Sequence, residues 1–485
     1  MKVLQIFKKV SFLLFLSGLL VSCETWTDVK PQTQVEEELF FSKESGYKDL
    51  LAGVYIKMGD PALYGRELTF GVSDVLAQYY DLSLEPSREN QTYQRAEKAN
   101  YADTEVRKLI DNIWSNGYNA ITNLNLLLQK LENADQSIFQ EGNYDIIKGE
   151  ALGLRAYVHF DMLRLFGASV RSGGNAAKAI PYVTAYKNQV TPHSTHAEVI
   201  AYILNDLKQA RSLLAQDPIV TGRPITSDHD NGYLMSRSLR FNYYAVRALE
   251  ARVHLWAGHT EDALIAAQEV ISVAETKFPW VQNAQLTGTE NNIDRTFTSE
   301  YIFGLFQNKK IENIEGYITD QAYNFQPLAI TTGTLNTIYP LAESGADIRR
   351  IYLTRTVFGQ IYFAKMYQTT QTNPSFANRM PLIRIPEMYY IAAEALIGRD
   401  NATAVGYLEK VRTARGVSRR LSIDVSNTQL ETEIALEYRK EMPSEGQLFY
   451  YNKRLNKTSV PGYSGSYNTQ YYVLPLPLNE IEYGR

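Results

Sequence analysis

The sequence predicts a mainly α-helical fold, in which paired helices form a scaffold that carries long irregular loops and small hairpins. Long segments repeat apolar residues at helical spacing, and two later segments share one pattern of small residues. The stretch from about 276 to 385 is instead rich in Thr, Asn, Gln, Tyr and Gly. The 485 residues are 45% hydrophobic and 21% charged, which is the profile of a folded chain with a large core.

The first 22 residues are expected to form a signal peptide. Lysines precede an apolar stretch from Val10 to Val21, whose helix would reach about 18 Å, short of the roughly 30 Å bilayer core. Leu20-Val21-Ser22-Cys23 then resembles the lipobox of bacterial lipoproteins, in which the cysteine becomes the first mature residue and carries lipid such as palmitate. We therefore expect Cys23 to be a membrane anchor. The alternative is a plain signal peptide that happens to end in cysteine.

Two segments in the first half have the periodicity of packed helices. The first covers residues 146 to 167 and ends at Gly167, where a helix stop is expected. The second covers residues 197 to 215. Their apolar residues at helical spacing are Ile147, Ala151, Leu154, Val158, Met162 and Leu165 in the first, and Val199, Ile203, Leu207 and Leu214 in the second.

Two later segments share a finer pattern of mostly small residues. The offsets from the first member are +3, +12, +16 and +19 in both, and this spacing resembles the tetratricopeptide (TPR) helix pair. Small residues at these positions let two antiparallel helices approach closely. The members are Ala251, His254, Ala263, Ala267 and Val270 in one segment, and Ala392, Ala395, Ala404, Leu408 and Val411 in the other.

The mature chain, 23–485, is expected to be a single domain in three parts. Helix pairs occupy residues 23 to about 275, and a loop-rich insertion with small hairpins occupies about 276–385. Within the insertion, Glu300–Phe306 has the composition of a short strand. A helix pair and a closing loop complete the chain over about 386–485.

Composition and motifs exclude several classes of function. The net charge is −4, which argues against a nucleic-acid partner, and the single Cys excludes a disulfide framework. Motifs for a serine nucleophile elbow, a phosphate-binding loop and HExxH are missing from the sequence, so no catalytic residues, metal or cofactor are predicted. His193 and His196 are expected in a solvated loop. Carboxylates are plentiful, so a glycosidase pair stays open as an alternative.

The remaining signal is an aromatic surplus of 34 Tyr, 19 Phe and 4 Trp. Aromatic faces stack on the apolar faces of sugar rings, and such rings must lie in loops to be exposed. Trp114, Tyr118 and Trp256 lie in helical patterns and are expected in the core. The candidates for ligand contact, each in a predicted loop or at a helix end, are Trp280, Tyr79, Tyr80, Tyr323 and Phe325.

Four sequence elements together resemble the SusD/RagB family of nutrient-binding surface lipoproteins of Bacteroidetes. The resemblance runs through nearly the whole mature chain. The elements are Gly149-Glu150-Ala151 with Arg155-Ala156-Tyr157 and Leu165-Phe166-Gly167; Pro386 to Ala395 with Val411 to Arg415; Glu437-Tyr438-Arg439-Lys440-Glu441 with Glu445-Gly446; and Leu474-Pro475-Leu476-Pro477 with Glu480. Leu448 and Tyr451 stand where the family usually has Arg and Asp, which indicates a divergent branch.

The resemblance implies a non-catalytic lipoprotein on the outer-membrane surface. It would bind an oligosaccharide, or a peptide in some branches, and act as the lid of a SusC-like TonB-dependent outer-membrane transporter. The resemblance does not place the binding residues. Two other hypotheses are a TPR scaffold that binds only protein partners and a secreted helical glycoside hydrolase, for which a close carboxylate pair in a cleft would decide.

Overall fold

The computed structural model describes residues 32–83, 91–140, 142–318, 328–357, 359–462, 467 and 469–484. The predicted anchor Cys23 and the predicted ligand aromatics Tyr323 and Phe325 lie outside these residues. Helices dominate the described chain, which confirms the predicted fold class. The longer ones are α3 (Glu44–Met58), α6 (Thr104–Glu132), α7 (Asn143–Phe166), α8 (His196–Leu213), α10 (Tyr243–Ala257), α11 (Thr260–Ile271), α18 (Ile385–Ala395), α19 (Asn401–Ala414), α20 (Asn427–Glu441) and α21 (Gln447–Arg454).

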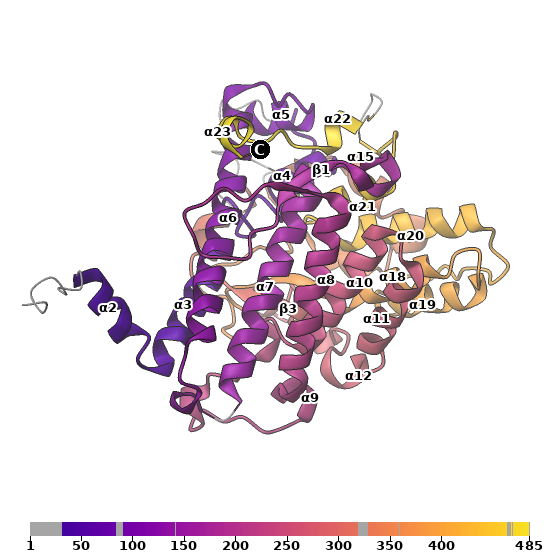
Figure 1. Cartoon of the computed structure of the whole chain (residues 1–485). Coiled ribbons are helices and arrows are strands. Elements are labelled where there is room, and N and C mark those ends of the chain that lie inside the picture. Colours follow the sequence, from indigo (N-terminus) through magenta and orange to yellow (C-terminus); the bar gives the residue numbers. More distant parts are fainter. Residues whose placement is uncertain are drawn as a thin grey trace, which may run out of the picture.

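The long helices form an array in which neighbours in the sequence are mostly neighbours in space (Figure 1). Contacts link α3 to α6, α6 to α7, α7 to α8, α8 to α10 and α10 to α11, and they continue through α18 and α19 to α20. Helix α2 (Gln32–Phe40) projects from the array at the left of Figure 1. Within the described part of the chain, no helix is both long and apolar enough to cross a bilayer.

Helix α7 is the centre of the array and is buried on nearly every side. It covers the segment predicted to be a helix and ends just before Gly167, as expected. Its neighbours approach so closely that a Cβ at Gly149 would lie 2.7 Å from Cγ of Leu214, and one at Gly153 would overlap the ring of Phe241. Glycines in this helix therefore exchange some helix propensity for close packing.

The two segments with the shared small-residue pattern form the helix pairs α10–α11 and α18–α19, and α11 packs on α18. Their pattern residues are fully or almost fully buried, except His254, which is half-buried. The expected close approach of paired helices is thus confirmed, and it arises because alanine leaves no side-chain bulk between the backbones.

The insertion contains short helices and small antiparallel sheets. The expected hairpin is β5 (Thr354–Val357) with β6 (Gln360–Phe363), to which β4 (Ala329–Ile330) adds a third strand. Strand β3 (Tyr301–Phe306) instead pairs with the distant β7 (Arg379–Arg384), so the two arms of the insertion meet directly before α18. The short helices of this region are α12 (Ala274–Lys277), α13 (Asn283–Leu286), α14 (Lys310–Ile314), α15 (Thr332–Ile338), α16 (Leu341–Ser344) and α17 (Ile348–Tyr352).

Elsewhere the chain is more ordered than the sequence predicts. Strand β1 (Lys178–Pro181) pairs with β2 (His193–Thr195) ahead of α8. The closing segment, expected to be loop, contains α22 (Thr469–Tyr472) and α23 (Leu478–Tyr483), and Tyr467 and Tyr472 are buried. The remaining short helices are α4 (Val72–Leu76), α5 (Gln91–Glu97) and α9 (Pro218–Thr221).

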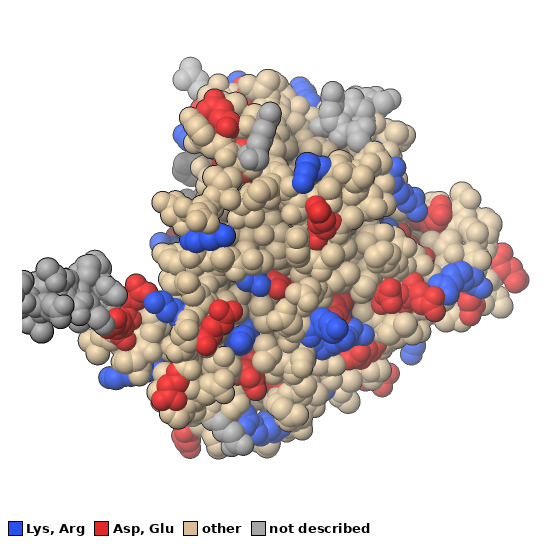
Figure 2. Space-filling view, viewed as in Figure 1, with Lys and Arg blue, Asp and Glu red and all other residues tan. Residues whose placement is uncertain are grey.

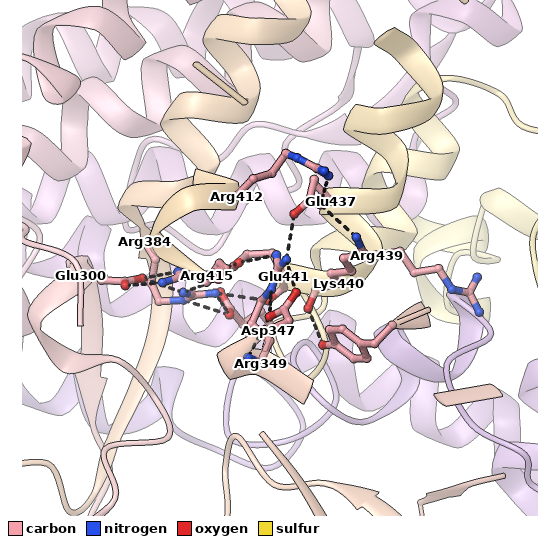
Figure 3. Close-up of polar contacts among 12 residues, drawn as sticks. Glu300, Asp347, Arg349, Arg384, Arg412, Arg415, Glu437, Arg439, Lys440 and Glu441 are labelled. Atoms are coloured by element: carbon pink, nitrogen blue, oxygen red, sulfur yellow. Dashed lines mark hydrogen bonds and ion pairs between the residues drawn. The ribbon is translucent and has the colours of Figure 1, made fainter. Parts of the chain in front are cut away.

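A buried network of ion pairs joins the insertion to the last helices (Figure 3). At its centre, the Glu441 carboxylate accepts hydrogen bonds from Arg349 (3.0 Å), Arg384 (2.8 Å) and Arg415 (3.0 and 2.9 Å). Burial alone would raise the pKa of Glu441, but these three guanidinium groups hold it well below its usual value. Arg415 also binds Glu300 at 2.7 and 2.6 Å. The charged residues of the last motif elements therefore act as scaffold.

The glycine of the Glu445-Gly446 element is required by the backbone geometry at this position. Gly446 has a φ of +69°, and a Cβ there would lie 2.9 Å from the carbonyl carbon of Leu68 and closer still to its oxygen. The buried carboxylate of Asp74 accepts hydrogen bonds from the backbone N–H groups of Ser444 (2.6 Å) and Gly446 (3.2 Å). Only glycine fits this junction between the N-terminal region and α21.

Candidate functional site

The structure buries two of the predicted ligand aromatics, so the expectation that they are exposed is wrong. Tyr79 is 0% and Tyr80 is 5% exposed, and both rings pack against Phe363. The Tyr79 hydroxyl donates to the carbonyl of Arg439 (2.9 Å), and that of Tyr80 donates to the carbonyl of Phe70 (2.8 Å). Both follow the helix end as predicted, but strand β6 covers that end, and local sequence carries no sign of such a cover.

Trp280 is half-buried. Its ring packs 5.4 Å from that of Tyr389, and the guanidinium of Arg415 lies 5.3 Å from its centroid. These contacts place it over the buried ion network. Its role in ligand binding stays a prediction, as do those of Tyr323 and Phe325.

Three histidines, His159, His193 and His196, have structural roles in this fold. His159 is buried: its Nδ1 donates to the Arg155 carbonyl (2.9 Å) and its Nε2 accepts from the backbone of Val183 (3.0 Å), as expected for a packing histidine. The expected solvated loop at His193 and His196 is wrong. His193 contacts Glu480 at 2.7 Å, and buried His196 begins α8 and accepts from Nε1 of Trp256 at 2.7 Å.

A polar cleft of about 490 Å³ opens between α5, α6 and the turns that follow α3. We call it the polar cleft. Helix α6 supplies one wall because its apolar side faces the core, while polar residues spaced three or four apart share the opposite side. Asp103 caps α6 and also binds Nη1 of Arg95 on α5 at 2.9 Å, which holds the two helices together. The polar and aromatic lining residues are Asp60, Arg66, Glu67, Thr92, Tyr93, Glu105, Lys108, Asn112, Asn116 and Tyr317.

The base of the polar cleft is a preorganised cluster around Glu67, which is 3% exposed. Its carboxylate accepts hydrogen bonds from the Tyr93 hydroxyl (3.1 and 3.0 Å), from Nε of Arg66 (2.7 Å) and from the backbone of Val72 (3.1 Å). Burial, followed by the Glu67 charge, raises the pKa of Tyr93 well above its usual value, so this phenol stays a neutral donor.

Tyr317 is the half-buried aromatic of the polar cleft. Its ring centroid lies 6.2 Å from that of Tyr93, and the guanidinium of Arg66 lies over it at 5.0 Å. A cation over an aromatic face contributes about 0.5–1 kcal/mol at exposed sites, so Arg66 helps to hold this ring. Tyr317 belongs to the loop-rich insertion, as the predicted aromatics Tyr323 and Phe325 do.

The polar cleft mixes hydrogen-bond donors and acceptors without a strong excess of one charge. Its ionisable groups are two cations, Arg66 and Lys108, and three carboxylates, Asp60, Glu67 and Glu105. Asn112, Asn116 and Thr92 add neutral groups that can donate and accept. Sugar hydroxyls also donate and accept, so this lining suits a neutral, hydroxyl-rich ligand. Polar residues on the surface of a helix look the same in the sequence whether or not they line a cleft, so the sequence alone does not identify these lining residues.

A possible metal-binding group lies at the turn between α10 and α11. Ligand atoms of His254, His259 and Asp262 lie within 4.8 Å of one another. A tetrahedral zinc ion with bonds of about 2 Å would hold its ligands roughly 3.3 Å apart, so these side chains would have to move closer to bind one. The group therefore has suitable ligand types but is not preorganised.

Acidic and basic side chains are interspersed on the face of the molecule seen in Figure 2, and the upper part of that face is mostly uncharged. A protein that binds the phosphate backbone usually carries a continuous basic stripe. The face shown offers none.

Two family models match this chain, one in each half. A model described as "Starch-binding associating with outer membrane" matches residues 25–227, and the SusD family model matches residues 283–482. The second match includes Tyr317 and all of the ion network around Glu441. The chain belongs to the SusD/RagB family.

Relatives and solved structures agree with this assignment. SusD-like proteins P38 and P25 of Formosa agariphila are 24% and 23% identical over 269 and 258 residues, or 55% and 52% of this chain. The matched part spans 46% and 43% of those two proteins. A SusD superfamily protein of Bacteroides thetaiotaomicron has a TM-score of 0.68 at 22% identity, with 91% of this chain and 98% of that chain covered. A SusD-like carbohydrate binding protein of Bacteroides vulgatus has a TM-score of 0.71 at 17% identity, with 91% and 96% covered. These structures share the fold.

Proposed function

We propose that this protein is a non-catalytic surface lipoprotein that captures an oligosaccharide and delivers it to a TonB-dependent outer-membrane transporter. The observation that supports it best is the polar cleft: a half-buried aromatic, Tyr317, lies beside a mixed set of donors and acceptors in a chain of the SusD/RagB family. The carbohydrate binding named for the Bacteroides vulgatus relative supports the ligand class.

The bonding in the polar cleft favours capture over hydrolysis. A glycosidase needs one carboxyl group that can donate a proton and a second one at a fixed distance. Glu67, the buried carboxylate, instead accepts bonds from Arg66, Tyr93 and Val72, so its oxygens are occupied as acceptors. Ligand binding would then act by shifting the protein between open and closed positions over the transporter, with no bond broken.

The experiment is a binding screen of the soluble mature chain, beginning at Glu24, against neutral oligosaccharides and peptide mixtures, with released reducing ends assayed in parallel. We expect retention of an oligosaccharide without release. Binding of peptides alone would move the function to the peptide-binding alternative, and release of sugars would move it to the hydrolase. A protein that binds neither class, but pulls down only protein partners, would support the scaffold hypothesis and contradict our proposal.

The lipid anchor at Cys23 is the second part of the proposal. Lipidation places the domain at a membrane surface with the rest of the chain in water. A single acyl chain binds a membrane only weakly and reversibly, so stable attachment takes a second lipid chain or another membrane-binding signal. Metabolic labelling of the wild type and of Cys23→Ala with a palmitate analogue tests this anchor directly.

A further inference from the structure

A second cavity, of about 770 Å³, lies between α10, α18, α20 and α21 and shares no lining residue with the polar cleft. Its lining contains five basic side chains but only two carboxylates, Glu394 and Glu431. We call it the basic cavity. Its apolar wall includes Trp256, Leu448 and Tyr451. The basic residues are Arg171, Arg399, Arg439, Arg454 and Lys457.

The protein's own carboxylates neutralise this charge only in part: Asp81 acts on Arg439, and Glu394 and Glu431 act on Lys457, in each case from beyond ion-pair distance. Arg454 binds Glu394 with two parallel hydrogen bonds of 2.8 and 2.7 Å, so this pair is complete. Arg439 and Lys457 have no ion-pair partner among the described residues. Glu431 is exposed and forms no ion pair within the same part of the chain.

Of these two cations, Arg439 is the stronger indication of an anion-binding site, because it is only 5% exposed. One of its groups, Nη1, donates to the carbonyl of Pro461 (2.9 Å), but its Nε is buried without a hydrogen-bond partner. In Figure 3 the neighbouring side chains of α20 turn into the ion network, whereas the Arg439 guanidinium points away from it. A buried guanidinium without a carboxylate is costly unless an anion satisfies it.

Lys457 lies at the same cavity and is half-buried. Its ammonium is 4.7 Å from the centroid of the Tyr451 ring, so its positive charge is held next to an aromatic wall. Burial lowers the pKa of both Arg439 and Lys457. An anion placed between them would recover part of the hydration that each cation has lost.

We propose that the basic cavity binds an anionic saccharide, whose carboxylate or sulfate group is held by Arg439 and Lys457 while its ring lies against Tyr451. The saccharide part of this inference rests on the proposed function, whereas the preference for an anion follows from the cavity alone. The chain would then hold two sites of different chemistry, one for neutral and one for charged sugar units.

The test is calorimetric titration of the mature chain with a uronate-containing disaccharide, a sulfated disaccharide and the matching neutral disaccharide. The carboxylate and sulfate probes distinguish the two sources of the anion, and binding of either one supports the proposal. We expect Lys457→Gln to weaken binding of the anionic probe at least tenfold, and higher salt to weaken it further. Arg439→Gln should also weaken binding of the anionic probe. It is the second choice of variant because it also removes the hydrogen bond from Arg439 to the Pro461 carbonyl.

Two control variants separate this site from other effects. Lys410→Gln removes the same charge from an exposed position on α19 and should leave binding unchanged. Tyr317→Ala, in the polar cleft, should also leave the anionic probe bound. The proposal is overturned if neither anionic probe binds, if the neutral disaccharide binds equally well at this site, or if Lys457→Gln binds as the wild type does. Failure of the proposed function would look different: no neutral oligosaccharide would bind anywhere, while the response to Lys457→Gln would persist.

Discussion

Replacement of Glu441 by Gln tests whether the buried ion network is needed for stability. Glu441 is fully buried and accepts four charge-assisted hydrogen bonds from Arg349, Arg384 and Arg415, each of which is at most 2% exposed. The glutamine has nearly the same shape but no charge, and its amide can accept at one oxygen only. The positive charges of the three buried guanidinium groups would then be only partly neutralised, which destabilises the folded state.

The expected loss can be bounded from the geometry. Breaking a buried ion pair by removing one partner costs about 3–5 kcal/mol, and the other carboxylates around these arginines, such as Glu300 and Glu437, keep the loss near that range. The unfolding entropy of the mature chain, residues 23–485, is roughly 1 kcal/mol/K, so the melting temperature should fall by about 3–5 °C.

The assay is urea unfolding followed by circular dichroism, because urea leaves the ionic strength unchanged. Glu37→Gln is the matched control: it makes the same chemical change at a surface pair with Lys130, and these two side chains are 46% and 32% exposed. Exposed pairs contribute about 0–1 kcal/mol, so this variant should unfold almost as the wild type does. Equal, small losses in both variants would refute the reasoning.

Three further predictions concern the scaffold and the anchor. Gly446→Ala should destabilise the protein by about 3 kcal/mol or more in urea unfolding, because its Cβ would overlap the backbone of Leu68. Gly142 has a similar φ of +81° but open space around it, so Gly142→Ala should cost only about 1 kcal/mol. Equal losses in the two variants would contradict a role for the contact with Leu68. Burial lowers the pKa of His196 to about 4, so below about pH 6.5 the unfolded state binds a proton that the folded state does not, and stability should fall as the pH drops from 6.5 to 4. The variant His196→Gln keeps an acceptor for Trp256 and should show a shallower fall. A pH profile equal to that of the wild type would contradict this role of His196. Cys23→Ala should abolish incorporation of a palmitate analogue and release the protein from the membrane fraction, and labelling of that variant would rule out Cys23 as the anchor.

Local periodicity was enough to predict α7, α8 and the two close-packed helix pairs, but not the helices of the closing segment. The repeated offsets from Ala251 and Ala392 identify both close-packed helix pairs, because alanine positions are dictated by contacts within each pair. Pairings between distant segments were not predictable in this way. Strand β3 pairs with a strand more than 70 residues away, and the residues Tyr301–Phe306 carry no information that identifies β7 as the partner.

The candidate site was predicted less well than the fold. Loop position was used as a sign of exposure, and it failed at Tyr79 and Tyr80, because tertiary contacts from β6 cover them. The sequence points to the insertion as a source of ligand-binding aromatic residues, but it does not single out Tyr317. Its neighbours in the polar cleft come from α5, α6 and the turn after α3, and only the folded chain brings them together.

If the sugar binds in the polar cleft, its affinity depends on Tyr317 and not on Trp280. Calorimetry compares the wild type, Tyr317→Ala and Trp280→Ala with the neutral oligosaccharide retained in the screen. If the polar cleft is the site, Tyr317→Ala weakens binding about tenfold or more, equivalent to about 1.4 kcal/mol, while the variant remains folded and Trp280→Ala binds as the wild type does. Full affinity in folded Tyr317→Ala, with loss in Trp280→Ala, would contradict the claim and restore the site predicted from sequence at Trp280.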